Sequence, residues 1–261
     1  KMPRTAELEY VGGKVVRFFS HTGAVFILLG QTVIAFSEIQ KRIGLWFDQM
    51  LFVGVRSLPL IVITSIFTGG VSAWQAAYQF KGYIPLRYLG TAVGKAIVIE
   101  LAPVLTALVV AGRVGAAMAA EIGTMKVTEQ VDALEAMGVN PVSYLVFPRV
   151  AGSIIMLPVL TVFADFIAII GAMAVAVFFV GLSGEIFLNG VKLFFHISDL
   201  VSGLVKAAVF GLIISLVGCY NGLLAEGGAE GVGRSTTRAV VWASVLILIS
   251  DYVVATLLFS I

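Results

Sequence analysis

Long runs of apolar residues constrain this chain more than any other feature of its sequence. A helix needs roughly 20 apolar residues to cross about 30 Å of hydrocarbon. Charged residues make up 12% of the chain and mean hydropathy is +1.04, whereas roughly a quarter of residues are charged in soluble domains. We therefore predict an all-α integral membrane protein whose five transmembrane helices lie at about 51–74, 89–111, 150–182, 204–224 and 239–261.

A sixth apolar stretch, 21–40, is short for a crossing. Its apolar part ends at Phe36, and Arg17 and Lys41 flank it. Such a helix fits the cytoplasmic membrane interface better than the hydrocarbon core, although a true crossing is the alternative. We therefore divide the chain into an N-terminal cytoplasmic or interfacial helical segment, 1–50, and a transmembrane domain, 51–261.

Several classes of function are disfavoured by composition. The chain has one cysteine, Cys219, and two histidines, His21 and His196, which are too few for a disulfide framework or a metal cluster. The net charge of +2 is too small to indicate a nucleic-acid partner. We expect no catalytic site, no cofactor and no metal in this chain.

The distribution of Lys and Arg predicts the orientation. Twelve of the 17 basic residues are inside if the N-terminus is cytoplasmic, and basic residues favour the cytoplasmic side. The loop that holds Lys81 and Arg87 is a mild exception, because it would lie outside. We predict a cytoplasmic N-terminus and an external C-terminus.

The long loop between the second and third spans contains a candidate amphipathic helix at about 121–138. Val127, Val131 and Leu134 recur at helical spacing, with Thr128 as a candidate N-cap and Gly138 as a stop signal. The helix is either a surface element that covers the ends of the spans or a coupling helix that fits a groove on a soluble partner.

Three acids, Glu100, Asp165 and Asp251, fall inside predicted spans. A carboxylate at mid-bilayer costs about 2.5 to 3.5 kcal/mol on insertion scales, so each requires a reason. We interpret Asp165 and Asp251 as packing groups and Glu100, near Pro103, as a functional candidate.

Four motifs carry a family resemblance. They are AGRVGAAMAAEIGTMKVTEQVDALEAMGVNP (111–141), ELAPV (100–104), PR (148–149) and GVGRSTTRAVV (231–241). In this order they resemble the MlaE/YrbE family of ABC-transporter permeases, which includes the plant TGD1 permease of the chloroplast inner envelope. Many bacterial members have Arg before the membrane Glu, whereas this chain has Ile99.

The resemblance implies an MlaE-like permease fold and a lipid-transport function. It implies a homodimer that works with cytoplasmic ABC ATPase subunits, which bind and hydrolyse ATP-Mg, and with a periplasmic MCE-domain protein. The complex would move phospholipid or a related lipid between two membranes. The location would be the bacterial inner membrane, with the chloroplast inner envelope as the alternative.

Two groups of candidate residues follow. In the family architecture Glu100 would face a cavity and contact a headgroup or water. The aromatic side chains between Trp74 and Tyr83 would line the mouth of that cavity. The candidate lipid-binding residues are Trp74, Tyr78, Tyr83 and Glu100. The candidate ATPase-coupling residues are Glu121, Thr128, Glu129, Asp132, Glu135 and Met137.

Two other functions remain open at this level. The membrane carboxylates would also suit a proton-coupled secondary transporter, and the cytoplasmic helix would suit a scaffold that recruits a soluble complex without transport. ATP-dependent transport indicates the permease, transport that follows a pH gradient without ATP indicates the second, and binding without transport indicates the third.

Overall fold

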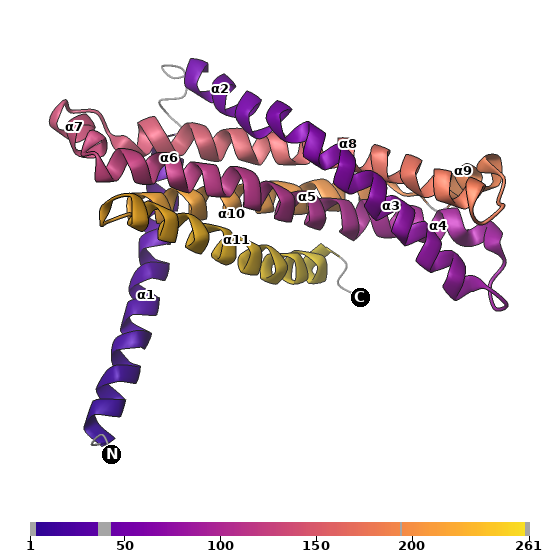
Figure 1. The fold of residues 1–261 in the computed structure, drawn as a ribbon, viewed down its shortest axis with the longest axis horizontal. Helices are drawn as coiled ribbons and strands as arrows, with labels where there is room; N and C mark the ends of the chain where they lie inside the picture. Colours follow the sequence, from indigo (N-terminus) through magenta and orange to yellow (C-terminus); the bar gives the residue numbers. More distant parts are fainter. Residues whose placement is uncertain (1–3, 36–42, 194, 259–261) are drawn as a thin grey trace.

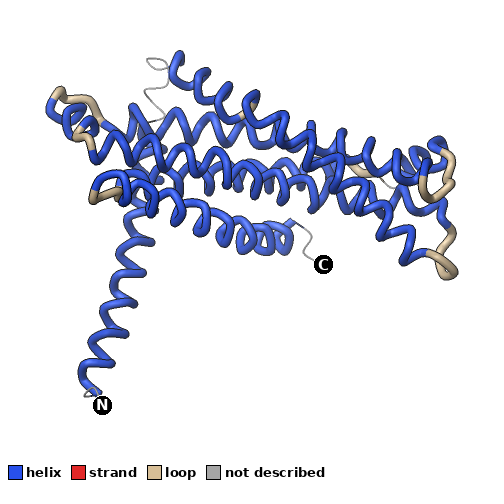
Figure 2. Tube along the Cα trace, in the orientation of Figure 1, coloured by secondary structure: helices blue, strands red, loops and turns tan. Residues whose placement is uncertain are grey.

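The computed structural model describes residues 4–35, 43–193 and 195–258, and every regular element in these ranges is a helix, as Figure 2 shows. A shorter apolar helical segment, Phe19–Ala35, precedes helices that are long enough to cross a membrane. These five candidate spans are Ile43–Phe80, Leu86–Val127, Val142–Phe178, Ile197–Leu223 and Gly228–Leu258. The predicted all-α membrane class is thereby confirmed.

The first span is broken once. It consists of α2 (Ile43–Val53), the 3-10 turn η2 (Val55–Ser57) and α3 (Leu58–Phe80). Pro59 lies at the start of α3, where its missing N–H removes no helical hydrogen bond. The break therefore separates a short α2 from the longer α3.

The second span contains two π-helical segments. Its elements are η3 (Leu86–Tyr88), α4 (Leu89–Ala96), η4 (Ile97–Leu101), α5 (Ala102–Val110), η5 (Ala111–Gly115) and α6 (Ala116–Val127). The π segments are η4 and η5. Single π turns inside longer helices occur frequently at functional sites, and Glu100 lies in η4.

The predicted end of this span at residue 111 is wrong, because the helix continues through η5 and α6. Alanine has the highest helix propensity, and α6 is rich in it. The charged Arg113 and Glu121, which appeared to mark a loop, have partners on neighbouring helices. The connection between the second and third spans is therefore shorter than predicted.

The candidate amphipathic helix is also shorter than predicted. The structure has α7 (Gln130–Ala136), separated from α6 by Glu129 in the left-handed region at φ 61°. Thr128 is not its N-cap, because this residue ends α6 and its Oγ1 donates to the Thr124 carbonyl at 2.8 Å. The apolar positions of 121–138 are thus divided between two helices.

The remaining elements complete the bundle. They are η6 (Val142–Val146), α8 (Phe147–Phe178), α9 (Gly184–Leu193), α10 (Ile197–Leu223) and α11 (Gly228–Leu258). Pro158 lies inside α8, which is a single helix. α7 lies at one end of the bundle in Figure 1 and α9 at the other, so α8 and α10 run between opposite ends in turn, and α11 runs back from the α7 end and stops short of α9.

The first helix, α1 (Arg4–Ala35), leaves the α7 end of the bundle and runs across the direction of the spans (Figure 1). Its last third packs on the bundle, where Leu28 is buried against a cluster that includes Val146 and Cys219. This course is the one expected of a helix in the membrane surface.

Small residues allow α3 and α8 to approach closely. A Cβ at Gly69 would overlap the carbonyl group of Ala168, and a Cβ at Gly171 would meet the backbone of Ile66. Helices in membranes associate through such small-residue contacts, which bring the two backbones together. The pairing of α3 with α8 therefore depends on glycine at these positions.

We expect Gly69→Ala to destabilise the protein by about 2 kcal/mol, because the added methyl group overpacks this contact. The measurement is thermal unfolding in detergent. Gly233→Ala is the matched control, since a Cβ there meets nothing within 4 Å and alanine favours a helix. Equal stability of the two variants would contradict the proposed role of Gly69.

Candidate functional site

An ion-pair cluster lies between the second, fourth and fifth spans. Lys206 on α10 is completely buried, and its Nζ lies 2.6 Å from Glu100 Oε1 and 2.9 Å from Asp251 Oδ1. The contact with Glu100 is an aligned hydrogen bond, in which Lys206 donates. A buried ammonium group is tolerated only when it is paired, so these three residues form one unit, the Glu100–Lys206–Asp251 triad.

The two carboxylates of the triad differ in exposure. The Glu100 side chain is 43% exposed, whereas that of Asp251 is 21% exposed. Glu100 therefore has one oxygen on Lys206 and an open side. This arrangement leaves Glu100 able to contact a ligand without breaking its ion pair.

Lys206 was not recognised as a candidate from the sequence, where it counted only toward the charge of an outside loop. The structure places it inside α10, as the predicted span 204–224 implies. A signal was available, because an isolated Lys in an apolar run requires an acidic partner. The two acids Glu100 and Asp251 were the candidates, and Asp251 is an ion-pair partner as well as a packing residue.

Asp165 on α8 has a different environment. It is 6% exposed, and neither carboxylate oxygen has a hydrogen-bond partner in the described part of the chain. The structure therefore places Asp165 in the packed interior, apart from the Glu100–Lys206–Asp251 triad.

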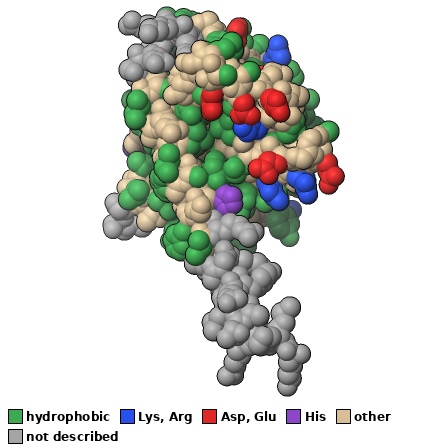
Figure 3. Space-filling view, turned by 90° about the vertical axis from the view of Figure 1, so that its left-hand side faces the viewer, with side chains coloured by type: hydrophobic (Ala, Val, Ile, Leu, Met, Phe, Trp, Pro, Cys, Tyr) green, Lys and Arg blue, Asp and Glu red, His purple; other side chains and the backbone are tan. Residues whose placement is uncertain are grey.

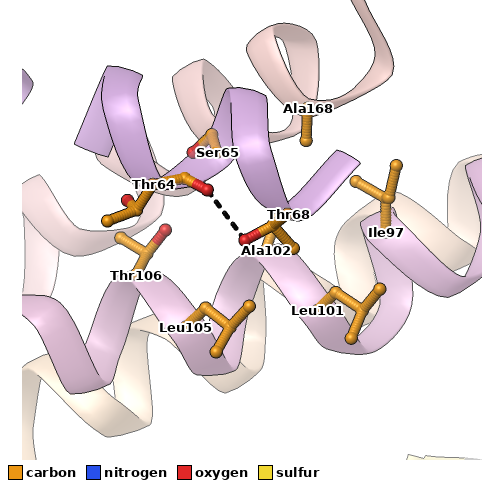
Figure 4. Close-up of a pocket in the computed structure, with 9 residues that line it drawn as sticks. All are labelled: Thr64, Ser65, Thr68, Ile97, Leu101, Ala102, Leu105, Thr106 and Ala168. Carbon is orange, nitrogen blue, oxygen red and sulfur yellow. Dashed lines mark hydrogen bonds between the residues drawn. The ribbon is translucent and has the colours of Figure 1, made fainter. Parts of the chain in front are cut away.

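A small pocket with four hydroxyl-bearing residues in its lining lies between α3, α5 and α8 (Figure 4). Leu101, the residue after Glu100, is also part of the lining. Thr64, Ser65 and Thr68 of α3 face residues of η4 and α5, including Leu101 and Thr106. Its volume of about 10 Å³ is near the minimum for one water molecule. It is too small for a lipid headgroup, so a lipid-sized space requires the open surface next to it or a second protomer.

The aromatic candidates lie near the end of the bundle opposite α7. Trp74 and Tyr78 are on α3, and Tyr83 lies in the turn after it. All three are largely exposed, Tyr83 at 90%, and Trp74 makes an edge-on contact with Phe179. Their exposure fits the predicted aromatic belt, but within the described residues no hydrogen bond, ion pair or ring contact joins them to Glu100.

Charged side chains gather at the α7 end of the molecule (Figure 3). Lys126 Nζ lies 2.6 Å from Asp132 Oδ1, which ties α7 to the end of α6. Glu129, Glu135 and Met137 are exposed there. These candidate coupling residues therefore share one open surface, which we call the α7 surface.

Glu121, the remaining coupling candidate, is held by a buried arginine. Arg149 Nη2 lies 2.8 Å from Glu121 Oε2, and Arg149 Nη1 donates to the Leu145 carbonyl. Arg149 itself is only 4% exposed. This ion pair links α8 to α6, the helix that precedes α7.

Arg113 in η5 makes a second connection. Its Nη1 donates to Ser57 Oγ at 2.6 Å and to the Phe52 carbonyl at 3.3 Å. These acceptors lie on either side of the break between α2 and α3. Hydrogen bonds thereby join η5, the second π segment of the second span, to the break between α2 and α3 in the first span.

Comparisons with known proteins agree on one family. Residues 46–257 match the family described as Permease MlaE. A probable ABC transporter permease protein of Rickettsia typhi is 43% identical over 254 residues, which cover 96% of this chain and 97% of the relative. A probable ABC transporter permease protein of Synechocystis is 42% identical over 93% of this chain and 92% of the relative.

A plant relative is similar along almost the whole of this chain. The Arabidopsis thaliana protein TRIGALACTOSYLDIACYLGLYCEROL 1, chloroplastic, is 35% identical over 255 residues. The aligned part covers 98% of this chain and 73% of the relative.

Proposed function

Because the chain belongs to the MlaE family of ABC transporter permeases, we propose that it moves phospholipid or a related lipid, driven by a separate ATPase. The main support for this proposal is the match of residues 46–257 to the MlaE permease family. The plant relative supports the choice of lipid, since it bears the name of a glycolipid. The triad adds the half-exposed Glu100 carboxylate, a polar group inside a candidate span that a headgroup can reach.

Two copies of the chain would form the transport path. α11 is the least buried of the five spans, and its apolar side chains Trp242, Leu248 and Tyr252 are exposed. A second copy would cover part of such a surface, and most soluble homo-oligomers form closed symmetric assemblies of this kind. The half-exposed Glu100 would then face a shared cavity with apolar walls.

The α7 surface would receive the ATPase. Two connections would carry movement from there: Lys126–Asp132 joins α7 to α6, and Glu121–Arg149 joins α6 to α8. ATP binding can shift the permease between cavity states only if the ATPase binds one state better than the other. Helices joined by ion pairs suit that role, because a displacement of one helix would be passed to its partner.

An MCE-domain protein would complete the complex at the opposite end, next to the exposed Trp74, Tyr78 and Tyr83. The location would be the bacterial inner membrane, as the Rickettsia and Synechocystis relatives favour, with the N-terminus in the cytoplasm. The decisive test is ATP-dependent lipid transfer by the permease reconstituted with its ATPase and MCE protein. Lipid transfer at the same rate without ATP would overturn the proposal.

Charge reversal on the α7 surface should uncouple the ATPase. We expect Glu129→Lys with Asp132→Lys to lower ATPase co-purification and lipid-stimulated ATP turnover several-fold. Both side chains are exposed, so the ion pair that is lost contributes at most about 1 kcal/mol to stability. Glu185→Lys, a charge reversal on α9 at the other end, is the control. Normal ATPase binding by the double variant would remove this surface from the mechanism.

A further inference from the structure

We propose that the Glu100 site selects lipids whose headgroup carries a hydrogen-bond-donating ammonium group, as phosphatidylethanolamine does. The inference rests on the proposed lipid-transport function and specifies the substrate class for that site. It follows from the charge of the triad and from the open oxygen of Glu100.

The charge of the triad is the first step. One lysine pairs with two carboxylates, so the ionised triad carries a net charge of −1. The next cation along the same span, Lys95, lies 3.3 Å from Asp199 and is neutralised there. An anionic headgroup would therefore meet uncompensated negative charge, whereas an ammonium group would be attracted.

The open side of Glu100 is the second step. Its Oε1 accepts a hydrogen bond from Lys206, and the described residues supply no hydrogen-bond donor to Oε2. The side chain is half-exposed, so a ligand can reach that oxygen. A primary ammonium group can donate a hydrogen bond to it, but the quaternary ammonium of phosphatidylcholine has no N–H to donate.

Ile99 makes the site more negative than an arginine at this position would. It lies next to Glu100 in η4 and supplies no polar atom. An arginine there would neutralise the net charge of the triad and offer donors to a phosphate. Ile99 therefore provides a direct means of reversing the preference.

Competition between lipids tests the proposal. The permease is placed in nanodiscs that contain equal amounts of dioleoyl phosphatidylethanolamine, phosphatidylcholine and phosphatidylglycerol, and its bound lipids are counted by native mass spectrometry. We expect phosphatidylethanolamine to be enriched about tenfold over each of the others, as a hydrogen bond to a charged group implies. Bound lipid in the proportions of the bilayer, or enrichment of phosphatidylglycerol, would overturn the selectivity and leave the transport function intact.

Three variants sharpen the result. Glu100→Gln should reduce the enrichment to about the bilayer ratio, and Ile99→Arg should favour phosphatidylglycerol. Ile99→Met, neutral and of similar size, should keep the wild-type preference, and unfolding temperatures verify that all three are folded. Unchanged preference in Glu100→Gln and Ile99→Arg would overturn the assignment to this site. Failure of the wild type to retain or transfer any lipid would instead refute the proposed function.

Discussion

Lys206→Met should destabilise the permease by about 3 to 5 kcal/mol, the range found when one partner of a buried ion pair is removed. The methionine fills a similar volume but leaves Glu100 and Asp251 without their common cation. Lys206 is completely buried, so water cannot replace the ammonium group at that position. Chemical or thermal unfolding of the purified protein measures the loss.

A neutral triad separates stability from function. Lys206→Met combined with Glu100→Gln and Asp251→Asn leaves no unpaired charge, and we expect it to recover most of the lost stability. Transport by this triple variant should nevertheless fall to the share that Glu100→Gln retains, because the charged headgroup contact is gone and only an amide oxygen remains as acceptor. A single Lys206→Met variant as stable as the wild type would show that the three residues are not energetically coupled.

The number and type of the spans were predictable, because the bilayer sets the length of apolar helix that a crossing needs. Their boundaries were not. Arg113 and Arg149 have the charge of loop residues, yet both lie within helices because Ser57 and Glu121 satisfy them. Such partners come from distant segments, which hydropathy along one stretch of chain does not reveal.

The region of α6 and α7 shows a second limit of sequence periodicity. Val127 and Val131 have the spacing of one helix face, but Glu129 between them adopts a left-handed conformation that ends one helix and begins another. Left-handed backbone is uncommon for a residue other than glycine, so nothing local predicted the break. The apolar pattern alone could not distinguish one helix from two.

The candidate site was predictable only in part. Glu100 was found because a carboxylate inside a span requires a reason, and the same argument applied to Asp251. Lys206 completes the site from 106 residues away from Glu100. The free-energy cost of a carboxylate in the membrane identified Glu100 and Asp251 from the sequence. Which residues of the site contact one another depends on how the spans pack.

Glu100→Leu should lower ATP-driven lipid transport by about a hundredfold, the factor that corresponds to about 2.7 kcal/mol. Leucine removes the hydrogen-bond acceptor that we assign to the headgroup and leaves Lys206 with Asp251 as its partner. Glu100→Gln keeps the shape and one acceptor oxygen, so it should retain a substantial share of transport. Reconstituted transfer of a labelled lipid, with and without ATP, measures both variants.

The same pair of variants distinguishes the permease from a proton-coupled transporter. A carboxylate that carries protons must titrate, and glutamine cannot, so proton coupling predicts that Glu100→Gln is as inactive as Glu100→Leu. It also predicts that a pH gradient drives the wild type without ATP. We expect the opposite: Glu100→Gln stays active, and all transport requires ATP at both an acidic and a neutral external pH. Inactive Glu100→Gln together with transport driven by the pH gradient would refute both the headgroup role of Glu100 and the ATP-driven mechanism, because the open carboxylate would then serve as the proton carrier.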